Sequence, residues 1–233
     1  MKILVTGCCG TIGRPLCRAL KEAGHEVYGW DLEHPREDLS HMLTAYARVD
    51  IGSMEEMTGA GSDFTPDLVF NLAAEFGRVN GDHYNARMWR SNVLGLRNVI
   101  SAFSNVVQFS SSEIYGDMPA GICDEPLFDT ISLQPKNDYA LSKFVGEKMI
   151  LNSDAGHFRI RLFNSYGPGE WPNAYRSVIA QFCRAALQGD KLTVFRGHRR
   201  DFVYIDDLVR TLAAIPEVWD DLPAEPRDRV CNI

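Results

Sequence analysis

The sequence predicts an α/β fold in which a parallel sheet is covered by helices on both faces. Short apolar runs that suit buried strands alternate with stretches of helical periodicity along most of the 233 residues. The first run, Ile3 to Val5, passes through Gly7, Gly10 and Gly13 into a helical pattern. A strand that turns through glycines into a helix is typical of a doubly wound sheet.

This glycine turn predicts a dinucleotide site. A helix N-terminus presents N–H groups and the positive end of the helix dipole, which favours a diphosphate. Gly7 permits a tight turn, Gly10 lets the diphosphate approach the main chain, and Gly13 lets the helix pack closely on the strand. Thr11 and Ile12 complete the loop. The alternative is a structural glycine turn without a ligand.

A second strand, residues 26–30, ends at Asp31, 18 residues after Gly13. A doubly wound nucleotide fold places an acidic residue about here, on the 2′-hydroxyl of the adenosine ribose. A carboxylate accepts a hydrogen bond from that hydroxyl and repels a 2′-phosphate, so we expect NAD rather than NADP. Arg36 could soften this preference, and a solvated turn residue is the alternative for Asp31.

Further strands and helices follow in alternation. Ser53 with Glu56 predicts the start of one helix, and Asp138 is expected to cap another. Strands are expected at residues 47–51, 68–74, 106–109, 159–163, 192–195, 202–204 and 230–233, helices at 84–102, 139–150, 177–188 and from 205, and a loop at 126–135. Because the last of these strands reaches the end of the sequence, we expect a C-terminally incomplete chain.

Several of these strands end in small or polar residues. In a doubly wound sheet, ligands bind at the carboxyl ends of the strands. Ala73 and Ala74 have small side chains that leave room for a flat cofactor ring. Asp31, Asp50, Ala73, Ala74 and Ser111 all fall at such ends, so we expect them to share one site.

Tyr139 and Lys143 are four residues apart, which places them on one face of the expected helix. The pattern YxxxK is common by chance at ordinary residue frequencies. It gains weight from Ser111, which lies 28 residues earlier at the end of an expected strand. The alternative is that Tyr139 and Lys143 are an ordinary pair on an amphipathic helix, without a role in a site.

Composition excludes other classes. The net charge is −7 with scattered charges, so we expect no nucleic-acid partner, and no apolar run approaches the length of a membrane span. A first strand that begins at Ile3 leaves no room for a signal peptide, so we expect a cytoplasmic protein with reduced thiols. The six cysteines show no CxxC pair, and no metal site is predicted. Cys8 is either a redox-sensitive thiol or a small buried filler.

Together these motifs resemble the extended short-chain dehydrogenase/reductase family, in its nucleotide-sugar epimerase/dehydratase branch. The motifs that carry the resemblance are TGxxGxxG at 6–13, Asp31, Asp50, NLAA at 71–74, SSSEIYG at 110–116, YxxxK at 139–143, NxYGP at 164–168 and RDFVYIDD at 200–207. The resemblance implies a Rossmann domain at residues 1–163 and a small, incomplete substrate lobe at 164–233. It also implies a homodimer formed through a two-helix face.

The resemblance implies roles for individual residues, and it adds Ile51, Leu72, Tyr139 and Lys143 to the expected cofactor site. Tyr139, as phenolate, would remove the proton from a sugar hydroxyl while hydride leaves the same carbon, C4, for NAD. Lys143 would lower the pKa of Tyr139 together with the cationic nicotinamide and would bond the nicotinamide ribose, and Ser111 would orient the reacting oxygen. Glu113 is a candidate general base at C5, or a residue that orients water or a loop.

The resemblance also implies a substrate. Asn164, Ser111 and Ser112 match positions that contact the nucleotide sugar, and Arg200 matches the residue that pairs with its diphosphate, with Arg199 as the rival. The implied activity is an NAD-dependent nucleotide-sugar epimerase or dehydratase. The alternatives are a nucleotide-hexuronate decarboxylase of the same family and a non-catalytic NAD-binding regulator.

Overall fold

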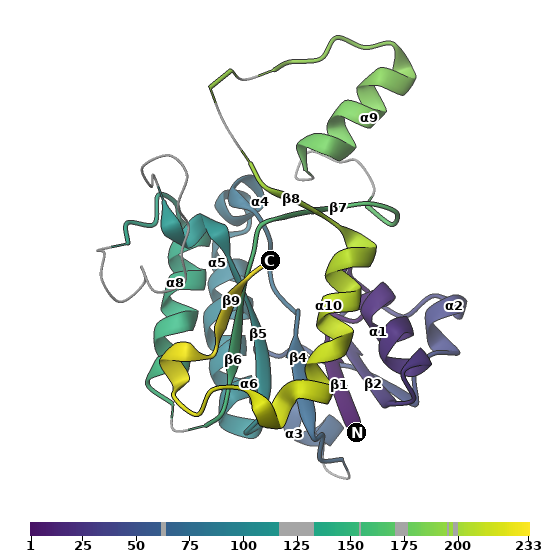
Figure 1. Ribbon diagram of the computed structural model, residues 1–233, viewed down its shortest axis with the longest axis vertical. Helices are drawn as coiled ribbons and strands as arrows, with labels where there is room; N and C mark the ends of the chain where they lie inside the picture. Colours follow the sequence, from purple (N-terminus) through teal and green to yellow (C-terminus); the bar gives the residue numbers. More distant parts are fainter. Residues whose placement is uncertain (62–63, 117–132, 154, 171–176, 195, 198–199) are drawn as a thin grey trace.

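Seven parallel strands form the main sheet in the computed structural model, in the order β3-β2-β1-β4-β5-β6-β9 (Figure 1). The structure describes residues 1–61, 64–116, 133–153, 155–170, 177–194, 196–197 and 200–233. The strands are β1 (Lys2–Thr6), β2 (Glu26–Asp31), β3 (Ala45–Arg48), β4 (Leu68–Asn71), β5 (Val106–Ser111), β6 (Phe158–Leu162) and β9 (Val230–Asn232). The predicted doubly wound α/β fold is confirmed.

The central strands are apolar on both sides because each side faces a separate core. Ile3 and Val5 belong to one hydrophobic cluster, while Leu4 between them belongs to the other. The same alternation places Phe70 in the first cluster and Val69 in the second. Successive side chains of a strand point to opposite faces, so a continuous apolar run indicates a sheet that is covered twice.

Helices cover both faces of this sheet (Figure 1). Helix α1 (Gly13–Glu22) packs against α10 (Ile205–Val218), and both contribute to the first cluster. Helices α3 (Met54–Gly61) and α6 (Leu96–Ala102) contribute to the second. The remaining α-helices are α2 (Glu37–Ser40), α4 (Arg78–His83), α5 (Asn85–Trp89), α8 (Asp138–Leu151) and α9 (Val178–Gln188).

The helix predicted over residues 84–102 is not continuous. Between α5 and α6 the chain forms a π-helical segment, η1 (Arg90–Gly95). The buried Asn92 lies in this segment, and its side chain bonds the backbone of Glu75 and the hydroxyl of Ser142. Such polar contacts are absent from a periodicity analysis, which detects only the apolar face of the helix.

Three local predictions need correction. Residues 191–194 form no strand, although 192–195 were expected to do so. β3 ends at Arg48, because Val49 and Ile51 fill the core beyond the strand instead of extending it. Asn137, rather than Asp138, caps α8, and its Oδ1 accepts from the N–H of Ala140 at 2.8 Å. The predicted loop at 126–135 lies mostly outside the described residues.

A small second sheet and a separate helix follow the central strands. β7 (Asn164–Tyr166) pairs in parallel with β8 (Phe202–Tyr204) near the carboxyl ends of the main strands (Figure 1). Helix α9 stands beyond this pair, away from the main sheet (Figure 1). The described residues also form the 3₁₀ turns η2 (Ser112–Tyr115), η3 (Trp219–Asp221) and η4 (Pro226–Asp228), besides the π-helical segment η1. The described part of the chain contains no helix long and apolar enough to cross a membrane.

Candidate functional site

A cleft of about 510 Å³ opens at the carboxyl ends of the main strands. Its volume lies within the range usual for ligand pockets, roughly 300–1,000 Å³. All residues predicted to contact the cofactor line it: Gly7, Gly10, Thr11, Ile12, Gly13, Asp31, Asp50, Ile51, Leu72, Ala73, Ala74, Tyr139 and Lys143. The structure therefore brings together residues that are up to 136 positions apart in the sequence.

The glycine turn has the close packing that a dinucleotide loop needs. Gly7 has a φ of +70°, and a Cβ there would lie 2.8 Å from the backbone N of Ala73. A Cβ on Gly13 would lie 2.8 Å from the Cα of Cys8, whereas one on Gly10 would meet only the Gly7 carbonyl oxygen, at 3.2 Å. Gly7 and Gly13 thus serve chain packing, and Gly10 keeps the main chain open toward the cleft.

Helix α1 begins beside this turn without a side-chain cap. Its N-cap residue is Ile12, which has no side-chain acceptor for the first N–H groups. Ile12 lines the cleft, so an anion there would meet the start of a ten-residue helix. The positive end of the helix dipole favours a diphosphate at this place. The residues present therefore fit the diphosphate of a dinucleotide.

Asp31 lies at the carboxyl end of β2, next to the glycine turn. One carboxylate oxygen accepts from the N–H of Cys9 at 2.8 Å and the other from the N–H of Glu33 at 3.0 Å. These two bonds fix the orientation of the carboxylate, and each oxygen retains a second lone pair. Because Asp31 lines the cleft, its position fits a ribose hydroxyl donor.

Asp50 lies farther along the same edge and is paired with a cation. Its carboxylate accepts from Arg90 Nε at 3.1 Å and forms an ion pair with the same guanidinium at 3.0 Å. The other oxygen accepts from the N–H of Gly52 at 2.8 Å. Arg90 belongs to η1, so the π-helical segment supports this end of the cleft.

Tyr139 and Lys143 both line the cleft, as their spacing on one helix face predicts. Ser111 is close enough to Tyr139 for its side chain to act on the pKa of the tyrosine. Lys143 Nζ lies 5.9 Å from the centre of the Tyr139 ring and donates to the carbonyl oxygen of Phe109 at 2.9 Å. Lys143 is only 6% exposed, so burial and one backbone acceptor hold its ammonium in place.

Burial is the largest influence on the pKa values of Tyr139 and Lys143. It raises the pKa of Tyr139, and the nearby Glu113 carboxylate adds to that rise. The Ser111 hydroxyl and the N–H of Gly77 act in the opposite direction because they bond the phenolate, but they are outweighed. Burial lowers the pKa of Lys143 to about 8. The described protein groups therefore do not lower the pKa of Tyr139 below its ordinary value.

The serine run places its three members differently. Ser111 ends β5, and its Oγ accepts from the N–H of Glu113 at 3.2 Å, which starts the 3₁₀ turn η2. Ser112 follows in that turn and is half-buried. Ser110 lines the cleft instead, and its buried hydroxyl has no hydrogen-bond partner among the described residues.

A buried polar chain that the sequence did not reveal connects the glycine turn to Lys143. The Thr6 hydroxyl donates to Asn71 Oδ1 at 2.6 Å, and Asn71 Nδ2 donates to Gln108 Oε1 at 2.6 Å. Gln108 Nε2 then donates at 3.1 Å to the carbonyl of Phe109, which also accepts from Lys143. The chain crosses β1, β4 and β5, so the pattern of any single strand cannot reveal it.

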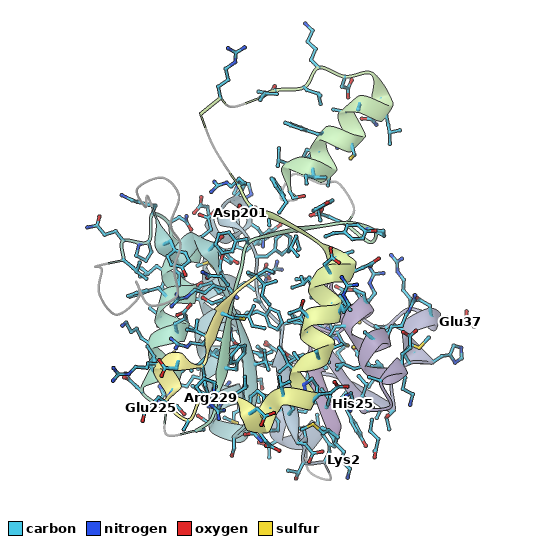
Figure 2. The ribbon with its side chains drawn as sticks, in the orientation of Figure 1. Lys2, His25, Glu37, Asp201, Glu225 and Arg229 are labelled. Atoms are coloured by element: carbon cyan, nitrogen blue, oxygen red, sulfur yellow. The ribbon has the colours of Figure 1, made fainter. Side chains whose placement is uncertain are left out.

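The predicted substrate residues Asn164 and Arg200 lie outside the cleft lining. Asn164 lies in β7, and its amide donates at 3.0 Å to the carbonyl of Asp201, which Figure 2 labels near the carboxyl ends of the strands. Arg200 is exposed just before β8, and its rival Arg199 lies outside the described residues. Their roles toward a substrate remain predictions.

Sequence reasoning also missed part of the cleft wall. The additional lining residues are Cys9, Leu32, Glu33, Val49, Glu75, Phe76, Ser91, Phe109, Ser110 and Leu162. Five of these ten residues, Cys9, Leu32, Val49, Glu75 and Ser110, immediately follow or precede a predicted site residue, which is a signal that could have found them. Ser91 could not have been found in this way, because the π-helical segment turns it toward the cleft.

Known proteins share this sequence pattern and fold. The profile of the NAD dependent epimerase/dehydratase family matches residues 3–226. The UDP-glucose 4-epimerase of Mycolicibacterium smegmatis is 30% identical over 232 residues, which cover 90% of this chain and 71% of that protein. The UDP-N-acetyl-alpha-D-glucosaminuronate decarboxylase of Bacillus cytotoxicus is 31% identical over 235 residues, which cover 93% of this chain and 71% of that protein.

A solved structure is similar as well. The UDP-glucose 4-epimerase of Thermus thermophilus, in complex with NAD, is 28% identical and superimposes with a TM-score of 0.80. The match covers 92% of this chain and 74% of that one. The glycine turn, the serine strand end and the YxxxK helix lie within the residues that the family profile matches. This chain therefore belongs to the NAD dependent epimerase/dehydratase family.

Proposed function

We propose that the chain binds NAD in the cleft and transiently oxidises C4 of a nucleotide sugar, which it then epimerises or dehydrates. The observation that carries this proposal is that Tyr139, on whose pKa Ser111 acts, lines the same cleft as the glycine turn and Lys143. When bound, NAD would accept hydride from C4 and return it to the sugar. Asp31 would select NAD over NADP, since its carboxylate repels a 2′-phosphate.

In this proposal, protein side chains remove the proton of the C4 hydroxyl and orient the reacting oxygen. Tyr139 takes the proton from the C4 hydroxyl at its phenolate oxygen, and Ser111 holds that oxygen in line. Burial disfavours the phenolate, so the positive charge that NAD brings into the cleft is required in addition to Lys143. Lys143, held by the Phe109 carbonyl, is placed to bond the nicotinamide ribose.

Glu113 favours a second candidate reaction of the same family. A 4-keto sugar has an acidified proton at C5, and Glu113 is close enough to Tyr139 to raise its pKa. One relative at 31% identity is a UDP-N-acetyl-alpha-D-glucosaminuronate decarboxylase. With a hexuronate substrate, the same oxidation at C4 would lead to loss of the carboxylate as carbon dioxide, and Glu113 would orient water or the sugar.

The proposal is tested by incubating the protein with NAD and UDP-, GDP- and dTDP-sugars, including hexuronates, with product masses as the readout. An isomer of unchanged mass indicates epimerisation, loss of water indicates dehydration, and loss of carbon dioxide indicates decarboxylation. Tyr139→Phe is expected to lower turnover at least 1,000-fold, roughly the upper range for a general base, while NAD still binds.

Two results would contradict the proposal. Near-normal turnover by the Tyr139→Phe protein would exclude Tyr139 as the base. NAD binding without conversion of any sugar in the panel would favour the non-catalytic regulator.

A further inference from the structure

Two adjacent thiols and a carboxylate meet at one corner of the cleft. Cys8 and Cys9 lie between Gly7 and Gly10, and their sulfur atoms are 3.9 Å apart. Asp31 reaches the same place from the end of β2, where it accepts from the N–H of Cys9 at 2.8 Å. One ligand atom from each of the three residues lies within 4.8 Å of the other two. The parallel pairing of β1 with β2 holds this group together.

The spacing of these atoms fits a tetrahedral metal ion. With Zn–S bonds of about 2.3 Å, two sulfur ligands at tetrahedral positions lie about 3.8 Å apart. The Cys8 and Cys9 sulfur atoms are already at this distance, at 3.9 Å. A carboxylate oxygen bound to the same ion would lie about 3.5 Å from each sulfur, and an Asp31 oxygen already lies within 4.8 Å of both sulfur atoms.

Without an ion, burial keeps the two thiols neutral. Burial and the surrounding thiols and carboxylate raise the pKa of Cys8, and burial followed by the Asp31 charge raises the pKa of Cys9 to about 11. A divalent ion reverses this, because it stabilises thiolates directly. The charged and titratable groups around the two thiols are Cys17 and Arg14 from α1, Asp31 and Glu33 at the end of β2, and Tyr46 from β3.

We propose that Cys8, Cys9 and Asp31 bind Zn²⁺ and that this ion and NAD exclude each other. Cys8 is fully buried, whereas Cys9 and Asp31 line the cleft, so an ion can enter from the cleft and keep water as its fourth ligand. Exclusion, which rests on the proposed NAD site, follows because the ion would occupy the carboxylate that otherwise accepts from the adenosine ribose. The spacing of cysteines in the sequence does not reveal this site, since the third ligand lies 22 residues later.

The ion site is tested by titrating the reduced protein with Co²⁺ as a spectroscopic substitute for Zn²⁺. We expect a thiolate-to-cobalt charge-transfer band that Zn²⁺ abolishes by displacement. Cys9→Ser is expected to weaken Co²⁺ binding at least 100-fold, while Cys183→Ser, which removes an exposed thiol on α9, leaves it unchanged. No charge-transfer band, or a band that survives in the Cys9→Ser protein, would overturn the site.

The pH dependence of Co²⁺ binding shows how many thiols coordinate the ion. Coordination of two thiolates releases two protons, so the Co²⁺ affinity should rise about 100-fold from pH 7 to pH 8. A rise of about tenfold or less would overturn a site that uses both thiols.

Competition is measured separately, by titrating NAD with and without saturating Zn²⁺. We expect Zn²⁺ to raise the apparent Kd of NAD, and NAD to raise that of Co²⁺ by the same factor. Unchanged Kd values with both ligands bound would overturn mutual exclusion. If the protein binds Co²⁺ but not NAD, the proposed function fails while the ion site stands, so the two failures are distinguishable.

Discussion

At the scale of single residues, we propose that Asp31 selects the dinucleotide that the cleft accepts. Asp31→Asn removes the negative charge that opposes a 2′-phosphate but keeps one acceptor oxygen. Since hydrogen bonds to charged groups contribute roughly 1.5–3 kcal/mol, we expect NAD to bind about 10- to 100-fold more weakly and NADP more tightly. Calorimetric titration with both dinucleotides measures the change. An unaltered ratio of the two Kd values would show that Asp31 does not contact the ribose.

Gln108 is the residue through which the buried polar chain reaches Lys143. Gln108→Leu removes the acceptor of Asn71 and one of the two donors on the Phe109 carbonyl. A buried amide left without its partner costs about 1–3 kcal/mol of stability. We also expect a lower kcat with an almost unchanged KM for NAD, because the Phe109 carbonyl that accepts from Lys143 loses the Gln108 donor that helps to fix it. Loss of stability with an unchanged kcat would mean that Gln108 serves the fold alone.

At the scale of elements, a buried cluster of charged side chains joins helix α8 to the main sheet. Glu147 of α8 is fully buried and accepts from Arg161 Nε and Nη2, each at 2.9 Å, and Arg159 lies 3.4 Å away. Arg161 also donates at 2.8 Å to the hydroxyl of Tyr115, which donates in turn to Asn232 of β9. The cluster thus ties α8, β6, η2 and β9 together behind Ser111.

Glu147→Gln tests this connection. The substitution leaves two buried guanidinium groups without a counter-charge, so we expect about 3–5 kcal/mol less stability. Glu217→Gln on the exposed face of α10 is the matched control, with an expected change within about 0.5 kcal/mol. Urea unfolding of the three proteins gives both values. Equal stability of the Glu147 variant and the wild type would show that the cluster does not stabilise the fold.

Local patterns predicted most elements, and the failures have physical causes. The glycine turn, β2 ending at Asp31 and the YxxxK helix follow from periodicity and turn chemistry, which depend on neighbours in sequence. The π-helical segment makes contacts far along the chain through Asn92, and residues 192–194 pair with no strand of the two described sheets. In the site, residues at strand ends could be predicted from single strands. The Gln108 chain and the Cys8–Cys9–Asp31 group could not, because they form only when neighbouring strands pair.

At the scale of the whole molecule, His157 makes stability depend on pH. It is fully buried immediately before β6, and neither ring nitrogen has a hydrogen-bond partner among the described residues. Burial and Arg229, which Figure 2 labels at the amino ends of the strands, lower its pKa from 6.5 to about 4. The unfolded chain therefore takes up the proton first as the pH falls, and stability is lost between these two values.

Unfolding measured from pH 7 to pH 5 tests this assignment. The wild type is expected to lose about 2 kcal/mol more than His157→Leu over this range, since one pKa unit corresponds to about 1.4 kcal/mol. Parallel curves for the two proteins would mean that His157 is protonated equally in the folded and unfolded states. The predicted homodimer, for which Leu94 and Leu141 provide exposed apolar side chains, stays a prediction at this scale.

The central claim is that hydrogen leaves C4 of a nucleotide sugar as hydride and returns to the same molecule. The most direct test uses the sugar that the panel identifies, labelled with deuterium at C4, in ordinary water. A hydride held in the cleft does not exchange with solvent, so we predict that the product retains the deuterium. The label is expected at C4 after epimerisation or decarboxylation and at another carbon after dehydration. Loss of the deuterium to water during turnover would contradict it.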